Sequence, residues 1–300
     1  MKIEIWPKHG PLNSKDIFDK FITSLKNAGE EVFINQKTNA DVAVIWSVLW
    51  SGRMSAYRSI WNEYQRKGKP VVVIEVGGIK RNETFKIAIN GINREADFAN
   101  HNFDDKRWPK FNIQLKPWKQ TGDNIIICGQ HGNSHQWRNN LPMIQWFGNE
   151  IKSIRKFSDK PIVVRPHPRN HVTINIAEFE NVSIVGPKRN PKTYDDTDLN
   201  SQFENAWALV NHSSNPAMQS VFNGIPVFVS EASLCYEVAN LTYESLCKPK
   251  MPDRQTWANQ LAYTEWFADE IEQGIPWQRI KKRLLEKMVN TIINMSGYLK

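Results

Sequence analysis

Polar side chains gather in three short segments of the second half of the sequence, and each segment follows an apolar run. The segments are GQHGNSHQW at 129–137, RPHPRN at 165–170 and NHSSN at 211–215. Their amides, hydroxyls, imidazoles and guanidinium groups suit the binding of a polar or charged ligand. In open parallel sheets, ligands bind beyond the carboxyl ends of the strands. If the apolar runs are neighbouring strands, the three segments therefore form one ligand site.

The first two segments combine small or stiff backbone with hydrogen-bonding side chains. Gly129 lets backbone approach a ligand, and His131 offers an imidazole. Prolines on both sides of His167 stiffen its backbone, and Arg165 can donate two parallel hydrogen bonds, which suits a phosphate. Because a Gly-rich loop after a strand is also an ordinary turn, the arginine segment carries more of this prediction.

The third segment places five hydrogen-bonding side chains between an apolar run and a helical pattern. The run at 208–210 predicts a buried strand, and Pro216 predicts the first turn of a helix. Ser214 or Asn215 is then the N-cap of that helix. Free amides at a helix start, together with serine hydroxyls, form an anion site suited to a diphosphate. Capping alone would explain one or two of these residues and not the whole segment.

The elements that must position these segments alternate between strand and helix. In the first part, strand patterns at 2–6, 31–35, 41–46 and 70–78 alternate with helical patterns at 14–28 and 54–67. In the second part, strand patterns at 124–130, 161–168, 182–186, 208–214 and 225–230 alternate with helical patterns at 142–157, 198–205 and 217–223. This alternation predicts parallel sheets covered on both faces. We expect two α/β domains, 1–117 and 118–265, a ligand cleft between them, and helices at 266–300.

The chain is basic, and its charge is unevenly distributed. Its 39 Lys and Arg against 31 Asp and Glu give a formal net charge of +8. Up to Pro117 there are 19 Lys and Arg against 13 Asp and Glu, and the remainder holds 20 against 18. An excess of lysine is often a solubility feature. Basic charge concentrated in one domain, however, attracts a polyanion and gives salt-dependent affinity.

Several protein classes are disfavoured by composition. No apolar run approaches the roughly 20 residues that cross a bilayer. The start of the sequence has no apolar signal core, and Cys128, Cys235 and Cys247 lack metal-ligand spacing, so we expect a soluble cytoplasmic protein without a membrane partner. Asp196 and Asp198 have the spacing of an acidic metal motif, but a helix N-cap accounts for Asp198 better, and we expect no essential metal.

Three stretches resemble nucleotide-sugar glycosyltransferases of the GT-B fold. They are RPHP at 165–168, NHSSNPAMQSVFNGIPVFV at 211–229 and WANQLAYTEWFADEIEQGIPWQRI at 257–280. The likeness covers 124–280 and is nearest to capsule-type sugar transferases and to phage proteins that glycosylate hydroxymethylated bases in DNA. It implies two facing Rossmann-like domains, with C-terminal helices that bridge back to the first domain.

The same resemblance implies a donor site in the second domain. The diphosphate of a nucleotide sugar would lie on the Ser-rich turn, with a UDP-sugar such as UDP-glucose as the first candidate and no further cofactor. Many members have a glutamate in the following helix that binds the donor ribose, whereas Gln219 stands at that position here and Glu231 is the nearest carboxylate. The donor-binding residues expected are Gly129, His131, Arg165, His167, His212, Ser213, Ser214, Asn215, Gln219 and Glu231.

A catalytic base is expected from the first domain, because direct displacement at the sugar needs a base beside the acceptor hydroxyl. Glu75 interrupts the apolar run at 70–78 and precedes Gly77 and Gly78, which puts a carboxylate at a strand exit beside flexible backbone. His101 and Asp104 are the alternatives. The enzyme expected is therefore a metal-independent hexosyltransferase.

The acceptor expected is double-stranded DNA that carries a hydroxymethylated pyrimidine such as 5-hydroxymethylcytosine. The likeness to phage transferases and the basic first domain motivate this prediction. The base would have to flip out of the duplex to reach a cleft carboxylate, and Lys80, Arg81 and Arg94 would contact phosphates. A capsule-type transferase acting on a saccharide or lipid, and a non-catalytic nucleic-acid-binding protein, are the alternatives. We expect a monomer, in the host cytoplasm if the chain is phage-encoded.

Overall fold

The chain folds into two units, each with its own sheet and core. The structure is a computed structural model, which describes the backbone of residues 1–170, 172, 174–188 and 199–297 and their side chains up to residue 287. Asp196 and Asp198 lie outside the described residues. One unit comprises Met1–Arg107 with Asn259–Lys300, and the other comprises Trp108–Ala258. The chain thus returns to the first unit at Asn259. The domain boundaries predicted from the sequence were residues 117 and 265.

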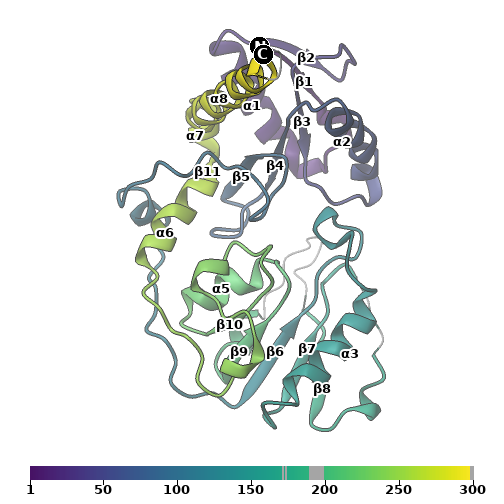
Figure 1. Cartoon of the computed structure of the whole chain (residues 1–300), viewed down its shortest axis with the longest axis vertical. Coiled ribbons are helices and arrows are strands. Elements are labelled where there is room, and N and C mark those ends of the chain that lie inside the picture. Colours follow the sequence, from purple (N-terminus) through teal and green to yellow (C-terminus); the bar gives the residue numbers. More distant parts are fainter. Residues whose placement is uncertain (171, 173, 189–198, 298–300) are drawn as a thin grey trace. The chain divides into compact units, whose positions relative to one another are not determined.

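A six-stranded mixed sheet forms the centre of the first unit, in the order β11-β5-β4-β3-β1-β2 (Figure 1). Its strands are β1 (Lys2–Ile5), β2 (Glu31–Ile34), β3 (Val42–Trp46), β4 (Val71–Val76), β5 (Thr84–Ile89) and β11 (Glu265–Phe267). The first four strands pair in parallel, whereas β5 runs antiparallel to β4 and β11 antiparallel to β5. The sequence had predicted parallel strands alone here and a helical tail. The expectation of parallel strands was wrong at β5 and β11, and the expectation of a helical tail was wrong at β11.

Amphipathic helices cover this sheet. They are α1 (Lys15–Asn27), α2 (Tyr57–Arg66), α7 (Ala268–Glu272) and α8 (Ile275–Gly297), while α6 (Gln255–Leu261) contains the boundary between the units. Helix α1 buries Ile17, Phe18, Phe21 and Leu25, whose spacing of three and four residues puts them on one face. The Phe21 ring packs edge to face on Trp277 of α8, with centroids 6.0 Å apart. The C-terminal helices are therefore part of the first unit's core.

A buried arginine ties the returning segment to the first unit. The Arg107 guanidinium is 5% exposed and donates to both carboxylate oxygens of Glu270, at 2.6 and 2.7 Å. It also donates to the carbonyls of Ala262 and Glu265, each at 2.6 Å, and it lies 3.9 Å from the centroid of the Trp266 ring. Charge-assisted, bidentate bonds of this kind fix geometry as well as contribute energy.

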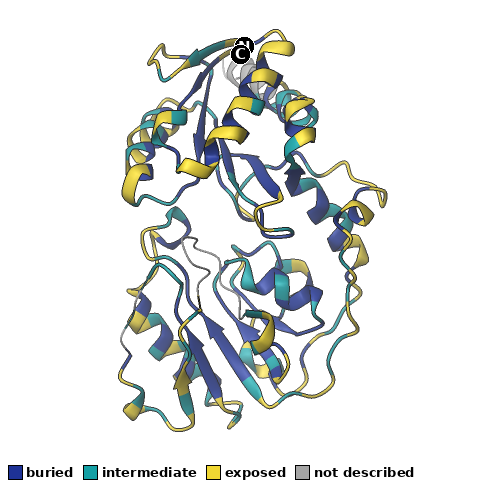
Figure 2. Cartoon of the chain, turned by 180° about the vertical axis from the view of Figure 1, so that it is seen from behind, coloured by how far each residue is buried: buried dark blue, intermediate teal, exposed yellow. Residues whose placement is uncertain are grey.

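The second unit has a five-stranded parallel sheet in the order β10-β9-β6-β7-β8. Its strands are β6 (Asn124–Cys128), β7 (Ile162–Arg165), β8 (Val182–Ile184), β9 (Ala206–Val210) and β10 (Val227–Phe228). The helices are α3 (Met143–Ile154), α4 (Leu199–Gln202) and α5 (Pro216–Phe222). The central strands are buried, as expected for parallel strands covered on both faces (Figure 2). The predicted α/β class with two Rossmann-like domains is confirmed.

Candidate functional site

The three polar segments of the second unit follow strands that are neighbours in its sheet. Strand β6 pairs in parallel with β7 on one side and with β9 on the other, so the three carboxyl ends lie at one edge. The pairing continues one residue beyond β6, where the Gly129 amide donates to the Arg165 carbonyl at 2.9 Å. This arrangement is the one predicted from the order of apolar runs.

Gln130 connects the segments after β6 and β9. Its Oε1 accepts a hydrogen bond of 3.1 Å from the Ser213 hydroxyl, and both side chains are buried. Its carbonyl accepts from Asn170 Nδ2 at 3.4 Å, which adds the segment after β7. Gln130 therefore joins all three segments, although it was not among the donor-binding residues expected from the sequence.

Two histidines meet beside this junction. The rings of His131 and His167 pack edge to face, with centroids 5.5 Å apart and an interplanar angle of 74°. Each Nδ1 accepts a backbone N–H from the residue two positions on, Asn133 or Arg169, at 3.1 Å. A neutral imidazole that accepts at Nδ1 carries its proton on Nε2 and can donate there. Burial, and then the charge of Arg169, lower the pKa of His131 below its ordinary value of 6.5.

Gly129 is required by packing. A Cβ at this position would lie 2.7 Å from Cζ of Phe147 and 3.4 Å from the backbone nitrogen of His167. Phe147 is fully buried in the core of the unit, so it has little freedom to withdraw. The glycine therefore lets the loop after β6 lie directly on the core, where it meets the loop after β7.

Hydrogen bonds within the third segment hold its turn. Asn211 is 2% exposed, and its Nδ2 donates to the carbonyl and hydroxyl of Ser214 at 2.9 and 3.0 Å. The His212 carbonyl accepts from the backbone and hydroxyl of Ser230 at 3.1 and 3.0 Å. Asn215 is the N-cap of α5 but makes no side-chain cap bond. The expected capping bond is therefore absent at this described helix start, and the seven-residue helix α5 is short for a strong dipole.

The remaining donor-binding candidates fall into two groups. Arg165 is only 3% exposed at the end of β7, and the His212 ring packs edge to face on Trp137 with centroids 5.2 Å apart. Gln219 lies in α5, and Glu231 is exposed in the turn after β10. The assignment of either residue as the ribose ligand stays a prediction.

An open cavity of about 460 Å³ lies beside the same loops. Gly132 and Asn133 line it from the loop after β6, and Asn170 lines it from the loop after β7. Leu141 and Ile144 give it an apolar wall, and they are 49% and 46% exposed. Pockets for drug-sized ligands have volumes of roughly 300–1,000 Å³. The cavity is therefore large enough for a nucleoside next to the polar strand ends.

Glu75, the predicted base, lies near the end of β4 in the first unit. Its side chain is half-buried, and its Oε1 accepts the Val76 amide at 2.8 Å. The next turn is fixed by Glu265, whose fully buried carboxylate accepts from the amides of Gly78 and Ile79 at 2.6 and 3.0 Å. Lys86, 2% exposed, lies opposite Glu75 on one side and Glu265 on the other. Neither Glu265 nor Lys86 was predicted to contribute to this region.

The other first-unit candidates occupy exposed positions. His101 and Asp104 lie after β5, and Asp104 accepts from the Tyr263 hydroxyl at 2.8 Å. That hydrogen bond, with one from the Lys106 amide, holds the Asp104 pKa below its ordinary value, which makes Asp104 a weaker base. Arg81 and Arg94 are exposed as well, whereas Lys80 is half-buried and pairs with Glu83 at 2.9 Å.

The described ranges contain neither a metal site nor a membrane span. No group of three or more His, Cys, Asp or Glu side chains there could hold a metal ion. None of the helices among these residues combines the length and apolarity that a bilayer span requires.

The chain matches no protein-family model and no curated protein. Solved structures share its fold. The beta Kdo 2,4 transferase of Thermosulfurimonas dismutans KpsC is 12% identical with a TM-score of 0.52, over 88% of this chain and 90% of that chain. The beta Kdo 2,7 transferase of the same KpsC is 14% identical with a TM-score of 0.52, over 93% of this chain and 100% of that chain. These likenesses confirm the predicted GT-B type of fold.

A third solved structure is more distant. The UDP-GlcNAc 2-epimerase of Methanocaldococcus jannaschii, in complex with UDP-GlcNAc and UDP, is 13% identical with a TM-score of 0.37, over 94% of this chain and 100% of that chain. The two KpsC structures show the fold alone, and an activity has to be argued from the residues of this chain.

Proposed function

We propose that the chain is a glycosyltransferase whose nucleotide-sugar donor binds at the strand ends of the second unit. The observation that carries the proposal is the convergence of three segments on Gln130, through the 3.1 Å bond from Ser213 and the 3.4 Å bond from Asn170. The buried Arg165 and the histidine pair lie at the same strand ends. The adjoining cavity of about 460 Å³ suits the nucleoside.

These groups suit the leaving diphosphate. When the bond between the anomeric carbon and the diphosphate oxygen breaks, negative charge develops on that oxygen. Fixed donors aimed at developing charge contribute much of the catalysis in such sites. We assign this role to Arg165 and to the Nε2–H groups of His131 and His167, because both Nδ1 atoms already accept backbone hydrogen bonds. The Ser214 hydroxyl, half-buried at the third strand end, is a further donor.

Glu75 is the proposed base. In the transfer, the acceptor hydroxyl oxygen bonds to the anomeric carbon as the diphosphate leaves, and the hydroxyl proton passes to a carboxylate. Glu75 Oε1 is occupied by the Val76 amide, while Oε2 accepts no hydrogen bond from the described residues. Glu265 and the turn at Gly78 keep the backbone after Glu75 in place.

The DNA acceptor stays a prediction, and its electrostatic support is weaker than the sequence indicated. Once the C-terminal segment is counted with the first unit, that unit has 23 Lys and Arg against 18 Asp and Glu, a balance of +5. The second unit has 16 against 13, a balance of +3. Charge alone therefore does not favour DNA over a saccharide, and an acceptor screen has to decide.

The test is a transfer assay with the full chain. UDP-glucose, UDP-galactose and UDP-GlcNAc are each incubated with duplex DNA containing 5-hydroxymethylcytosine, with the same duplex unmodified, and with neutral oligosaccharides. Mass spectrometry should detect one added glycosyl residue on an acceptor, together with released UDP. Salt-sensitive transfer to the modified duplex alone would support the DNA prediction. DNA binding without release of UDP from any donor would contradict glycosyl transfer and favour the non-catalytic alternative.

A further inference from the structure

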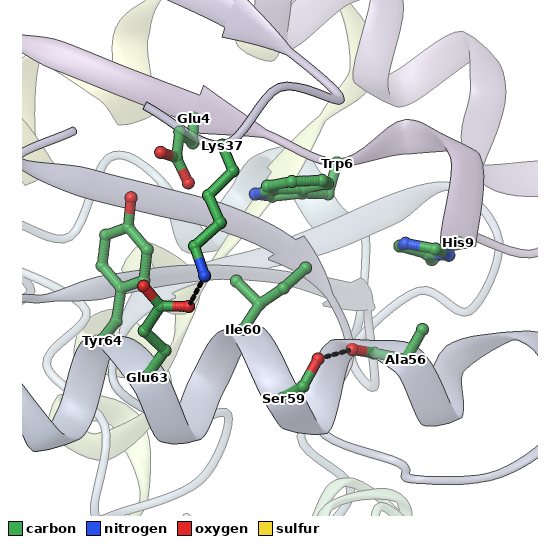
Figure 3. Close-up of a pocket in the computed structure, with 9 residues that line it drawn as sticks. All are labelled: Glu4, Trp6, His9, Lys37, Ala56, Ser59, Ile60, Glu63 and Tyr64. Carbon is green, nitrogen blue, oxygen red and sulfur yellow. Dashed lines mark hydrogen bonds and ion pairs between the residues drawn. The ribbon is translucent and has the colours of Figure 1, made fainter. Parts of the chain in front are cut away.

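The first unit contains a polar pocket that the donor site does not use. It has a volume of about 190 Å³ and lies between strand β1 and helix α2 (Figure 3). Glu4 and Trp6 line it from β1 and the residue that follows the strand, whereas Ile60, Glu63 and Tyr64 line it from α2. Pockets for drug-sized ligands measure roughly 300–1,000 Å³, so this one fits a ligand of about one ring.

Two buried hydrogen-bond donors of the pocket make no well-formed hydrogen bond to the described part of the chain. Trp6 is 8% exposed, and its indole Nε1 is buried without a hydrogen bond. In Figure 3 the nitrogen edge of this indole points into the space between Glu4, Lys37 and Tyr64. The Tyr64 hydroxyl points toward Glu4 but also makes no hydrogen bond of good geometry. Buried donors in native proteins rarely lack a partner, so the Trp6 nitrogen marks a place where a bound group can accept a hydrogen bond.

The same pocket offers an acceptor with spare capacity. Glu4 is 1% exposed, and its Oε1 accepts from the amide and hydroxyl of Thr38 and from the Ala40 amide. Beyond these bonds, the Tyr64 hydroxyl also interacts with the carboxylate. Burial opposes the charge, but the bonds from Thr38 and Ala40 and the nearby Tyr64 hydroxyl hold the Glu4 pKa below its ordinary value of 4.5. Glu4 is therefore a carboxylate at neutral pH.

The charges around the pocket offset one another. Glu63 pairs with Lys37 at 2.6 Å, and hydrogen bonds from Lys37 and Lys67 lower the pKa of Glu63 to about 2. Burial, with the charges of Lys8 and Arg53, lowers the pKa of His9, so this lining residue is neutral at pH 7. Lys37 and Lys67 thus offset the charge of Glu63, and the Lys8 ammonium lies 5.3 Å from the centroid of the Trp6 ring. The surroundings of the pocket therefore have no excess of negative charge, and a neutral ligand needs no further counter-charge there.

A ligand for this pocket must accept from the indole and donate to a carboxylate. A hydroxyl group does both, whereas an ammonium group only donates. Neutral hydroxyls also cost less to bury than the charges of an amino acid. Ile60 and the Trp6 ring provide apolar surface for the C–H groups of a sugar.

We propose that this pocket binds one neutral sugar ring, with hydroxyls that accept from Trp6 and Tyr64 and donate to Glu4. The site belongs to the first unit alone, and the proposal holds whether or not the chain transfers glycosyl groups.

The experiment is saturation-transfer NMR on the full chain with D-glucose, D-galactose and D-mannose, each alone and with UDP added. At least one hexose should receive saturation, and UDP should not displace it. Tyr64→Phe and Trp6→Phe each remove one donor, and each should weaken hexose binding roughly 2- to 10-fold. Tyr64→Phe should change the denaturation midpoint little, because the Tyr64 hydroxyl approaches Glu4 without a hydrogen bond of good geometry. If removing the Tyr64 hydroxyl lowers the affinity for hexose but not the stability of the fold, the hydroxyl contributes to ligand binding.

Tyr243→Phe is the matched control, because the Tyr243 hydroxyl donates to Glu150 in the second unit. It should lower the denaturation midpoint and leave hexose binding unchanged. The proposal is overturned if no hexose receives saturation or if UDP displaces the hexose. It is also overturned if glycine or inorganic phosphate binds the pocket instead, or if both pocket variants bind hexose like the parent chain.

Discussion

Arg107→Lys tests whether the returning C-terminal segment is held to the first unit as the structure indicates. The guanidinium makes four hydrogen bonds of 2.6 to 2.7 Å, to both oxygens of Glu270 and to two carbonyls. A single ammonium cannot span the Glu270 carboxylate and reach both carbonyls, so about two charge-assisted bonds are lost, at roughly 1.5–3 kcal/mol each. The stacking on Trp266 at 3.9 Å is weakened as well. We therefore expect a loss of about 3–6 kcal/mol.

Urea unfolding followed by tryptophan fluorescence measures this change as a shift of the transition of the first unit. Hydrogen exchange should also accelerate at the amides of Gly78 and Ile79, because Glu265 holds them and its own carbonyl accepts from Arg107. Arg53→Lys is the control, since exposed Arg53 donates, among the described residues, only to the Lys8 carbonyl, at 3.3 Å. It should change stability by less than about 0.5 kcal/mol. A loss below about 1 kcal/mol for Arg107→Lys would refute the reasoning.

Three other predictions concern the candidate site. Gly129→Ala should destabilise the second unit by about 1–3 kcal/mol in urea unfolding, because the added Cβ would lie 2.7 Å from Phe147. Gly132→Ala, whose Cβ would have its nearest atom at 3.8 Å, should leave stability unchanged, and equal effects of the two variants would contradict the packing argument. The pKa of His131 in the folded chain should lie below 6.5 by NMR, and the free energy of unfolding should fall as the pH drops from 6.5 through that pKa, because the unfolded chain takes up the proton first. A measured pKa of 6.5 or above would contradict the burial of the His131 ring. Glu75→Gln should lower turnover roughly 100-fold or more and leave UDP affinity unchanged; near-normal turnover would move the base to another residue.

The main features of the fold follow from sequence patterns that act locally. Buried parallel strands such as β3 are continuous apolar runs, and helices such as α1 repeat apolar residues every three or four positions. Strand β5 was missed because Lys86 interrupts its apolar residues, although the lysine is only 2% exposed between two acidic neighbours across the sheet. Strand β11 has three residues between helical patterns, and pairing with β5 alone makes it a strand.

The candidate site was predictable in its location and not in its internal bonds. Polar residues after neighbouring parallel strands must lie at one edge, which is a rule of topology. Which side chains bind one another depends on contacts far apart in the sequence, such as the bond from Ser213 to Gln130. The polar pocket at Trp6 was not predictable, because a tryptophan after a strand is usually core and its unpaired nitrogen is seen only in three dimensions.

Hydrogen exchange of the full chain with and without UDP tests the central claim most directly. Bound UDP should slow exchange in the segments 129–134, 165–170 and 211–215, because they line the proposed donor site at the ends of β6, β7 and β9. Glucose without the nucleotide should leave these segments unchanged. Protection by UDP in the first unit alone, with none in these three segments, would contradict a nucleotide-sugar site in the second unit.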